Sequence, residues 1–416
     1  MSAFFASLPD SVGNTTAIEA GLEAVTRWVE RHDYRAYDPG DGCLSPLRYL
    51  TFNTHFLRRL LTGAVLRAPF HIRPWIGIRP HTSTKGMGYM AWGYTDRYTL
   101  SRAEIHRERA QACFEWLTVH SEPGFGHYCW GNHFSFSTRA GTIPAHTPTI
   151  VWSSLIAMAF LEAYEVFGLA RYLDVAASTA EWVKTLPRER TSRGICLSYV
   201  PFEQTSIHNS NLLGAALLAR VAAHTGDREG VELAREAVRY TCSRQNPDGS
   251  WFYGEHPKYH WIDNFHTGYN LDSLKRFIES AADREFEANL KIGFQYFASH
   301  FFEEDGRPRY YNDRTLPTDI QCAAQAIDTL VYVGGADPVA LALADRVAQW
   351  TLEHMQAPDG HFYYRDLGWK KVETPMLHWG QATMFKALAH LLSKLNGQAK
   401  DSSQCDSTSP CDLQRP

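Results

Sequence analysis

The stretch YTCSRQNPDGSWFYGEHPKYHWIDNFHTGY, residues 240–269, spans one complete junction between two kinds of helix. It leaves an amphipathic helix, passes through a Pro-Asp-Gly turn and a run of aromatic residues, and enters a more apolar helix. In such turns glycine supplies a positive φ and aspartate caps its own turn. Four further glycine-containing turns have the same surroundings, at residues 122–124, 193–194, 305–306 and 358–360.

Outward from these junctions, the chain divides into two alternating sets of helices. The first set is amphipathic and carries an aromatic residue near each C-terminal end: Trp28, Trp116, Trp182, Tyr240, Tyr296 and Trp350. The second set is more apolar, and we expect it at residues 45–67, 148–168, 207–225, 263–283, 317–334 and 376–395. One helical hairpin cannot bury both of its helices, whereas six hairpins stacked in a closed ring can. The sequence therefore predicts an all-α (α/α)6 toroid with the apolar set inside.

The lengths of the connections predict which face of this ring carries the function. The long, aromatic-rich loops all precede inner helices, and the return connections are short and polar. We therefore expect the working site in a central pit at the N-terminal ends of the inner helices. The toroid should occupy residues 16–395, between a flexible N-terminus at 1–15 and a disordered tail at 396–416. Residues 68–101 are interpreted as a long insert across the functional face.

Composition excludes several classes of protein. The net charge is −4 and no Lys/Arg-rich face is obvious, which argues against a nucleic-acid-binding or anionic-membrane role. No apolar run reaches the length that a bilayer requires, and no secretion signal is evident, so we expect a cytoplasmic protein without a membrane span. The eight cysteines are scattered and favour reduced thiols. Cys129 with His127 or His133 is the one local zinc candidate, and we predict no metal and no cofactor.

Polar side chains open five of the expected inner helices, where an apolar helix would otherwise begin. N-capping explains some of them, but it does not explain histidines in register in four repeats, at His146, His208, His266 and His378. Asp263 and His266 lie three residues apart on a first helical turn and so share a face. A carboxylate there is stabilised in its charged form, which suits a general base or a partner for imidazole. A plain N-cap and structural histidines remain the alternative.

Two sets of candidate site residues follow. The candidate catalytic residues are Asp263, His266, Asp319, His208 and His378. The candidates for substrate binding are His146, Asn209, Asn264, Trp251, Tyr253, Trp261, Tyr269, Gln321, Trp379 and Gln381. Aromatic faces suit the C–H surfaces of sugar rings, and paired carboxylates across a pit are what glycosidases use. Asp319, Glu203 and Glu255 are the candidates for a second carboxylate.

Two family resemblances support this fold. Residues 245–251, Gln-Asn-Pro-Asp-Gly-Ser-Trp, resemble the QW motif of squalene–hopene and related terpenoid cyclases, where it is a structural staple; the acidic DxDD motif of those cyclases is absent. Residues 35–395 are similar to the VpsJ-like proteins of bacterial polysaccharide gene clusters, through residues 37–42, Arg73-Pro74, 85–88, 248–269 and 378–381. That resemblance implies a role in polysaccharide biosynthesis but assigns no catalytic residue. The six-hairpin shape is also similar to N-acylglucosamine 2-epimerases and unsaturated glucuronyl hydrolases.

Three functions compete at this point. The first is an enzyme of exopolysaccharide biosynthesis that acts on a sugar or oligosaccharide as a hydrolase, lyase or epimerase, in possible association with polysaccharide assembly enzymes. The second is a non-catalytic glycan-binding or assembly subunit, with aromatic and polar groups in the pit but no acid/base pair within mutual reach. The third is an isoprenoid-processing, terpenoid cyclase-like enzyme, which requires an apolar, aromatic pit with a buried acid.

Overall fold

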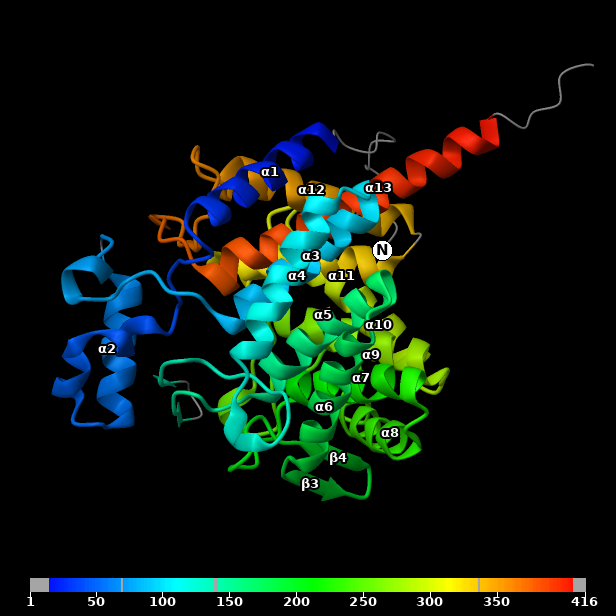
Figure 1. The fold of residues 1–416 in the computed structure, drawn as a ribbon, viewed down its shortest axis with the longest axis horizontal. Coiled ribbons are helices and arrows are strands. Elements are labelled where there is room, and N and C mark those ends of the chain that lie inside the picture. Colours follow the sequence, from blue (N-terminus) through cyan, green and yellow to red (C-terminus); the bar gives the residue numbers. More distant parts are fainter. Residues whose placement is uncertain (1–14, 69, 138–140, 336, 407–416) are drawn as a thin grey trace, which may run out of the picture.

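The computed structural model describes residues 15–68, 70–137, 141–335 and 337–406. Six inner helices form a closed ring, α3 (Thr84–Ser101), α5 (Ile150–Phe167), α7 (His208–Thr225), α9 (Asn264–Ala281), α11 (Ile320–Gly334) and α13 (Ala382–Asp406). Each packs on the next, and α13 packs back on α3. Six outer helices surround them, α1 (Thr15–Arg31), α4 (Glu104–Val119), α6 (Ala170–Thr185), α8 (Arg228–Cys242), α10 (Glu287–His300) and α12 (Pro338–Met355). The expected (α/α)6 toroid is confirmed (Figure 1).

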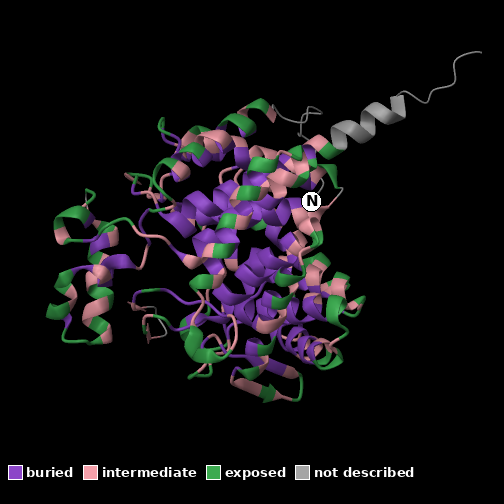
Figure 2. Cartoon of the chain, in the orientation of Figure 1, coloured by how far each residue is buried: buried purple, intermediate pink, exposed green. Residues whose placement is uncertain are grey.

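Burial follows this two-layer arrangement, as Figure 2 shows. Most residues of the inner helices α5, α7 and α11 are buried on all sides, whereas the outer helix α8 buries one face. In the described part of the chain, α5 is also the one helix long and apolar enough to cross a bilayer, and 72% of that segment is buried inside the ring.

The first inner helix is not where the sequence predicted it. Residues 45–67 lie outside the ring and form a 3-10 turn (Pro46–Thr51) and helix α2 (His55–Arg67). Only four residues of this segment are buried: Ser45, Thr51, Thr62 and Val65. The inner position is taken by α3, from the segment interpreted as an insert. The glycines of α3 lower its helix propensity, so the sequence pattern did not predict a helix there. The same glycines allow α3 to pack closely on its neighbours. A Cβ on Gly93 would come within 2.5 Å of the Phe385 ring on α13.

The aromatic-rich turns clamp neighbouring outer helices together. The turn glycines Gly194, Gly249, Gly306 and Gly360 all have positive φ, and each lies against a backbone carbonyl of the following outer helix, on α8, α10, α12 and α1 respectively. Trp350 on α12 donates to Asp305 of the preceding turn (3.0 Å), and Trp28 on α1 donates to Asp359 (3.1 Å). At these two positions the recurring aromatic residue of the outer set therefore holds a neighbouring turn, and the Trp28 contact helps to close the ring from α12 to α1.

Short strands and turns shape the loop face. They are the hairpins β1 (Phe136–Ser137) with β2 (Thr142–Ile143) and β3 (Arg188–Thr191) with β4 (Gly194–Leu197), and the three-stranded sheet of β5 (Thr318–Asp319), β6 (Arg365–Asp366) and β7 (Lys371–Val372). Further 3-10 turns cover Asp41–Leu44, Arg73–Ile76, Pro123–Phe125 and Pro257–Tyr259, and a π-helical turn, Leu377–Gln381, leads into α13.

The expected chain ends are only partly described. Helix α13 continues to Asp406, past residue 396 where the disordered tail was expected to begin. Residues 1–14 and 407–416 lie outside the described residues, as do 69, 138–140 and 336.

Candidate functional site

Asp263 and His266 form a hydrogen-bonded pair at the start of α9. Asp263 is the N-cap, and its Oδ1 accepts from the His266 backbone N–H at 3.0 Å. Its Oδ2 accepts from His266 Nδ1 and from Trp261 Nε1, both at 2.7 Å. The Asp263 side chain has no exposed surface, whereas that of His266 is 19% exposed. Because Asp263 binds Nδ1, the orientation of the imidazole is fixed and Nε2 can exchange a hydrogen bond or a proton with a ligand.

His266 lines an open pocket of about 270 Å³ on the loop face. The pocket lies between the loops that precede α7, α9 and α11 and the β1–β2 hairpin, and its lining is mainly aromatic: Tyr199, Phe202, Tyr253, Tyr259, Trp261, Tyr310 and Tyr311. Tyr253 stacks on Trp261 with centroids 4.6 Å apart and lies 4.4 Å from the His266 ring. Glu203 supplies the only carboxylate among the described lining residues.

The tyrosine hydroxyls of this pocket stay protonated at neutral pH. Burial raises the pKa of Tyr199 to about 12, and it raises the pKa of Tyr253 and Tyr310 well above the ordinary value. These side chains can therefore donate hydrogen bonds to a ligand while their ring faces remain apolar.

Each of the four in-register histidines pairs with a carboxylate of its own. His146 is an exposed rim residue 3.3 Å from Glu122, and buried His208 contacts Glu255 at 2.8 Å. His378 is buried, and its Nδ1 lies 2.7 Å from Asp38 Oδ2. Of the four, only His266 lines the described pocket. The four histidines lie at separate points around the ring and not at equivalent positions: His208 and His266 are in the first turns of α7 and α9, whereas His146 and His378 precede the first residues of α5 and α13.

Asp319 does not act as a second free carboxylate. It is fully buried at the start of α11 and accepts from the Gln321 backbone (2.9 Å) and Trp379 Nε1 (2.8 Å). Its other oxygen accepts from Arg365 Nε (2.8 Å) and Nη2 (2.5 Å). Asp319 therefore accepts four hydrogen bonds, and it caps α11 and holds Arg365 of the β6 strand. Trp379 contributes one of the four donors.

Two other candidate residues, Trp251 and Gln381, pack against the protein itself and do not line the pocket. Trp251 is buried between α8 and α10, where its Nε1 donates to the Thr241 carbonyl at 3.1 Å, so its staple role follows from packing. Gln381 binds both backbone groups of Phe362, at 2.7 and 2.8 Å. Both side chains position the loop face, because their polar atoms are already committed to the backbone.

The remaining candidates lie deeper, at the first turns of the inner helices. Asn209 Oδ1, both amide atoms of Asn264, and Gln321 Oε1 are buried without a hydrogen-bond partner in the described structure. Gln321 Nε2 donates to Tyr269, whose hydroxyl lies 2.9 Å from that of Tyr89. Buried amides without protein partners are sites that water or a polar ligand satisfies.

Lys85, on the first turn of α3, was missed as a site candidate because α3 was expected to be an insert. Its Nζ lies 5.7 Å from the ring centroids of both Tyr89 and Tyr269. Burial lowers the pKa of this ammonium to about 8, against the opposing charge of Asp38. The pocket residues Tyr199, Tyr310 and Tyr311 were also missed as site residues, although their place after the repeated turns was a usable signal.

Cys129, the candidate zinc ligand, lies in surroundings that keep its thiol protonated. Cys129 is buried, and burial raises the pKa of its thiol to about 12, so it stays protonated at neutral pH. Among the described side chains, no group of three or more His, Cys, Asp or Glu is arranged to hold a metal ion.

Comparison with known proteins identifies the class of fold. No protein-family model matches the chain, and no curated protein is similar to it in sequence. Among solved structures, a cellobiose 2-epimerase from Bacillus thermoamylovorans aligns over 76% of this chain and 90% of that chain, with 10% identity and a TM-score of 0.59. A GH76 α-mannanase from Bacteroides thetaiotaomicron aligns over 86% and 99%, with 13% identity and a TM-score of 0.60.

A third solved structure extends the likeness over nearly the whole chain. An unsaturated glucuronyl hydrolase specific for heparin aligns over 93% of this chain and 97% of that chain, with 12% identity and a TM-score of 0.59. At these identities the likeness shows the fold alone, and the chain shares the (α/α)6 toroid of these three proteins.

Proposed function

We propose that this protein is a carbohydrate-acting enzyme in which His266 transfers a proton to or from a sugar bound in the aromatic pocket. The observation that carries the proposal is the oriented imidazole: Asp263 holds Nδ1 at 2.7 Å while the ring lines a pocket of stacked aromatic side chains. A carboxylate on one nitrogen and substrate on the other is an arrangement suited to a general acid/base. Sugar epimerases, a mannanase and a glucuronyl hydrolase share the fold, which supports a carbohydrate substrate.

Among the reactions open at the sequence level, we favour epimerisation or isomerisation. A glycosidase of the usual kind needs two free carboxyl groups facing the scissile bond. Asp263 and Asp319 do not form such a pair, because each is buried and already hydrogen-bonded. Proton abstraction next to a carbonyl needs only one oriented base, with the electrons moving into an enolate. A second group returns the proton to the same carbon, and Glu203 is the carboxylate available in the pocket.

A hydrolase or hydratase that uses Glu203 as the acid and His266 as the base is the second candidate, since both line the same pocket. The two reactions leave different isotopic records. Epimerisation in D₂O incorporates deuterium at the carbon next to the carbonyl, whereas hydrolysis in H₂¹⁸O incorporates ¹⁸O into a new hydroxyl.

The test is a panel of reducing disaccharides and uronic-acid oligosaccharides incubated with the protein in both solvents and followed by NMR and mass spectrometry. We expect deuterium incorporation that His266→Gln abolishes. His224→Gln is the matched control, because His224 also pairs with a glutamate but lies at the opposite end of the inner helices. Glycan binding without either isotope change would support a non-catalytic binding subunit instead.

The biological setting is part of the same proposal. The resemblance to VpsJ-like proteins supports a step in exopolysaccharide biosynthesis. A strain that carries only His266→Gln should lose or alter its polymer, whereas one with His224→Gln should not. Normal polymer from both strains would remove this assignment.

A further inference from the structure

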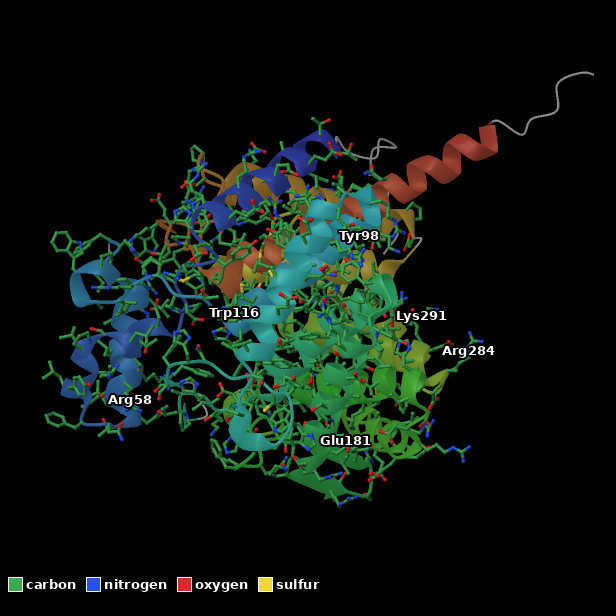
Figure 3. The ribbon with its side chains drawn as sticks, viewed as in Figure 1. Arg58, Tyr98, Trp116, Glu181, Arg284 and Lys291 are labelled. Carbon is green, nitrogen blue, oxygen red and sulfur yellow. The ribbon has the colours of Figure 1, made fainter. Side chains whose placement is uncertain are left out.

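A separate part of the molecule, residues 41–80, projects from the side of the ring; we call it the side lobe (Figure 1). It contains α2 and three 3-10 turns, and residue 69 within it is not described. Its own small core includes Val65 and Ile78, packed with Tyr37, Tyr364 and Met376 at the edge of the ring. Figure 3 shows Arg58 on this lobe, away from the toroid.

The side lobe exposes an unusual amount of apolar side chain. Of the fifteen large hydrophobic residues exposed in the described chain, eight belong to it: Leu47, Tyr49, Leu50, Phe52, Phe56, Leu60, Phe70 and Trp75. Trp75 is 85% exposed and Phe52 is 79% exposed. Phe56 and Leu60 are one helical turn apart on α2 and share a face. Single exposed hydrophobic residues are ordinary, but such a concentration marks an interaction surface.

The same lobe carries a one-sided charge. No Asp or Glu occurs between Asp41 and Asp96. Asp41 itself forms a buried ion pair with Arg73 at 2.9 Å. Five other arginines lie on the lobe, and no described carboxylate pairs with any of them: Arg48, Arg58, Arg59, Arg67 and Arg79. The whole chain is nevertheless acidic, with a net charge of −4.

A neighbouring hairpin extends this surface. Trp369, between β6 and β7, is 78% exposed and is followed by Lys370 and Lys371. Lys370 Nζ donates to the Ala68 carbonyl at 3.0 Å, so the hairpin borders the side lobe. A second tryptophan and two further cations thus lie beside the first set.

We propose that the side lobe docks on the surface of a bilayer that contains anionic phospholipids. Tryptophan, phenylalanine and leucine side chains insert at the level of the headgroups, and arginines bind the lipid phosphates. Charge selects this occupant over a second copy of the chain, since a symmetric dimer through this surface would bring two unpaired sets of arginines together. The surface is interfacial and does not require any helix to cross the membrane.

Docking has one consequence for the pocket, and that consequence rests on the proposed function. His55 on α2 contacts Thr142 of the β1–β2 hairpin at 3.0 Å, and Thr142 lines the pocket. A bound bilayer would therefore lie near the pocket mouth, which suits a glycan carried on a lipid or held at the membrane surface.

The docking is tested by flotation of the full chain with two kinds of vesicle. One kind contains phosphatidylcholine alone, and in the other about a third of the lipid is phosphatidylglycerol. We expect flotation only with the anionic vesicles, and its loss as salt rises, because headgroup attraction is screened. Phe56→Ser with Leu60→Ser and Trp75→Ser should weaken binding at least about tenfold, as should Arg59→Gln with Arg67→Gln and Arg79→Gln. All six side chains are exposed, so thermal unfolding should not change.

Matched controls come from the rest of the surface. Val119→Ser with Ile292→Ser removes exposed apolar side chains elsewhere, and Arg193→Gln with Arg284→Gln removes exposed cations. These variants and His266→Gln should float like the wild type, which separates docking from the pocket chemistry. Failure of the wild type to float at low salt, or equal flotation of the lobe variants, overturns the proposal. So does a concentration-dependent dimer without lipid that the lobe variants abolish.

Discussion

At the scale of single residues, exposure of the ring to a pocket separates His266 from His146, His208 and His378, which also pair with carboxylates. His208 and His378 also have carboxylate partners, but they are buried and lie outside the described pocket. His266 combines a buried carboxylate on Nδ1 with exposure of its ring to a pocket.

The first prediction concerns Asp263. Asp263→Asn retains an oxygen that caps α9 but places a neutral amide against His266 Nδ1. We expect the turnover rate to fall about a hundredfold or more, and the unfolding midpoint to fall as well, because Trp261 Nε1–H loses its acceptor although asparagine still caps the helix. Deuterium exchange and thermal unfolding measure the two effects. An unchanged rate would show that Asp263 is only a cap.

The second prediction concerns Lys85 and pH. Burial lowers the pKa of Lys85 to about 8 in the folded protein, whereas the ordinary value of 10.5 applies to the hydrated side chain of the unfolded protein. Between these values the unfolded chain binds more protons, so the free energy of unfolding should rise with pH through this group. The expected gain from pH 8 to 9.5 is about 1.5 kcal/mol. Urea unfolding of the wild type and of Lys85→Met should show this gain as the difference between the two proteins, because the buried thiols, whose pKa values are raised by burial, titrate alike in both.

At the scale of elements, the turns after the outer helices are the units that repeat most faithfully. Their glycines combine two constraints, a positive φ and contact with the next outer helix. The terpenoid-cyclase-like stretch at 245–251 is one such turn: Gln245 Nε2 donates to the Gly249 carbonyl (2.9 Å) and to the Asn289 carbonyl of α10 (3.0 Å). Its resemblance to a structural staple agrees with these contacts.

The third prediction compares two glycines. Gly249 has a φ of 95°, and a Cβ there would lie 2.4 Å from the Ile292 carbonyl oxygen. Gly226 also has a positive φ, 76°, but its Cβ would meet no atom within 4 Å. Gly226→Ala should cost about 1 kcal/mol from backbone strain, and Gly249→Ala clearly more because α10 must also move. Equal shifts of the urea midpoint would mean that the turn does not clamp α10.

At the scale of the whole molecule, buried charges join helices across the ring. Asp328 on α11 binds Lys386 Nζ at 2.7 Å and His390 Nδ1 at 3.0 Å, both on α13. Asp272 on α9 lies close by, and burial raises its pKa to about 6. These groups lie midway along α9 and α11 and in the first part of α13, and they are not among the residues that line the aromatic pocket.

The fourth prediction concerns this ion pair. Asp328→Asn leaves the Lys386 ammonium buried without its carboxylate, and we expect a loss of about 3–5 kcal/mol in unfolding free energy. Asp328→Leu combined with Lys386→Met removes both charges and should cost less than the single change. Denaturant unfolding of the variants tests the order. A double variant less stable than Asp328→Asn would contradict this account.

Charge shows why whole-chain averages mislead at this scale. The net charge of −4 argued against any anionic-membrane role, yet the arginines of residues 41–80 share one lobe almost without carboxylates. The absence of acidic residues from 42 to 95 was visible in the sequence. Its significance was hidden because residues 45–67 were assigned to the ring interior, where their apolar side chains would have been buried.

The sequence by itself determined the alternation of two helix types, the repeated turns and the face of the long loops, because periodicity and turn chemistry are local properties. Five of the six inner helices and all six outer helices follow from those patterns. Only the tertiary structure decided that α3, not residues 45–67, closes the ring, since that choice depends on glycine contacts with distant helices. It also decided that His266 faces a pocket while Asp319 is locked by Arg365, because the direction and partners of a loop side chain are set by residues far along the chain.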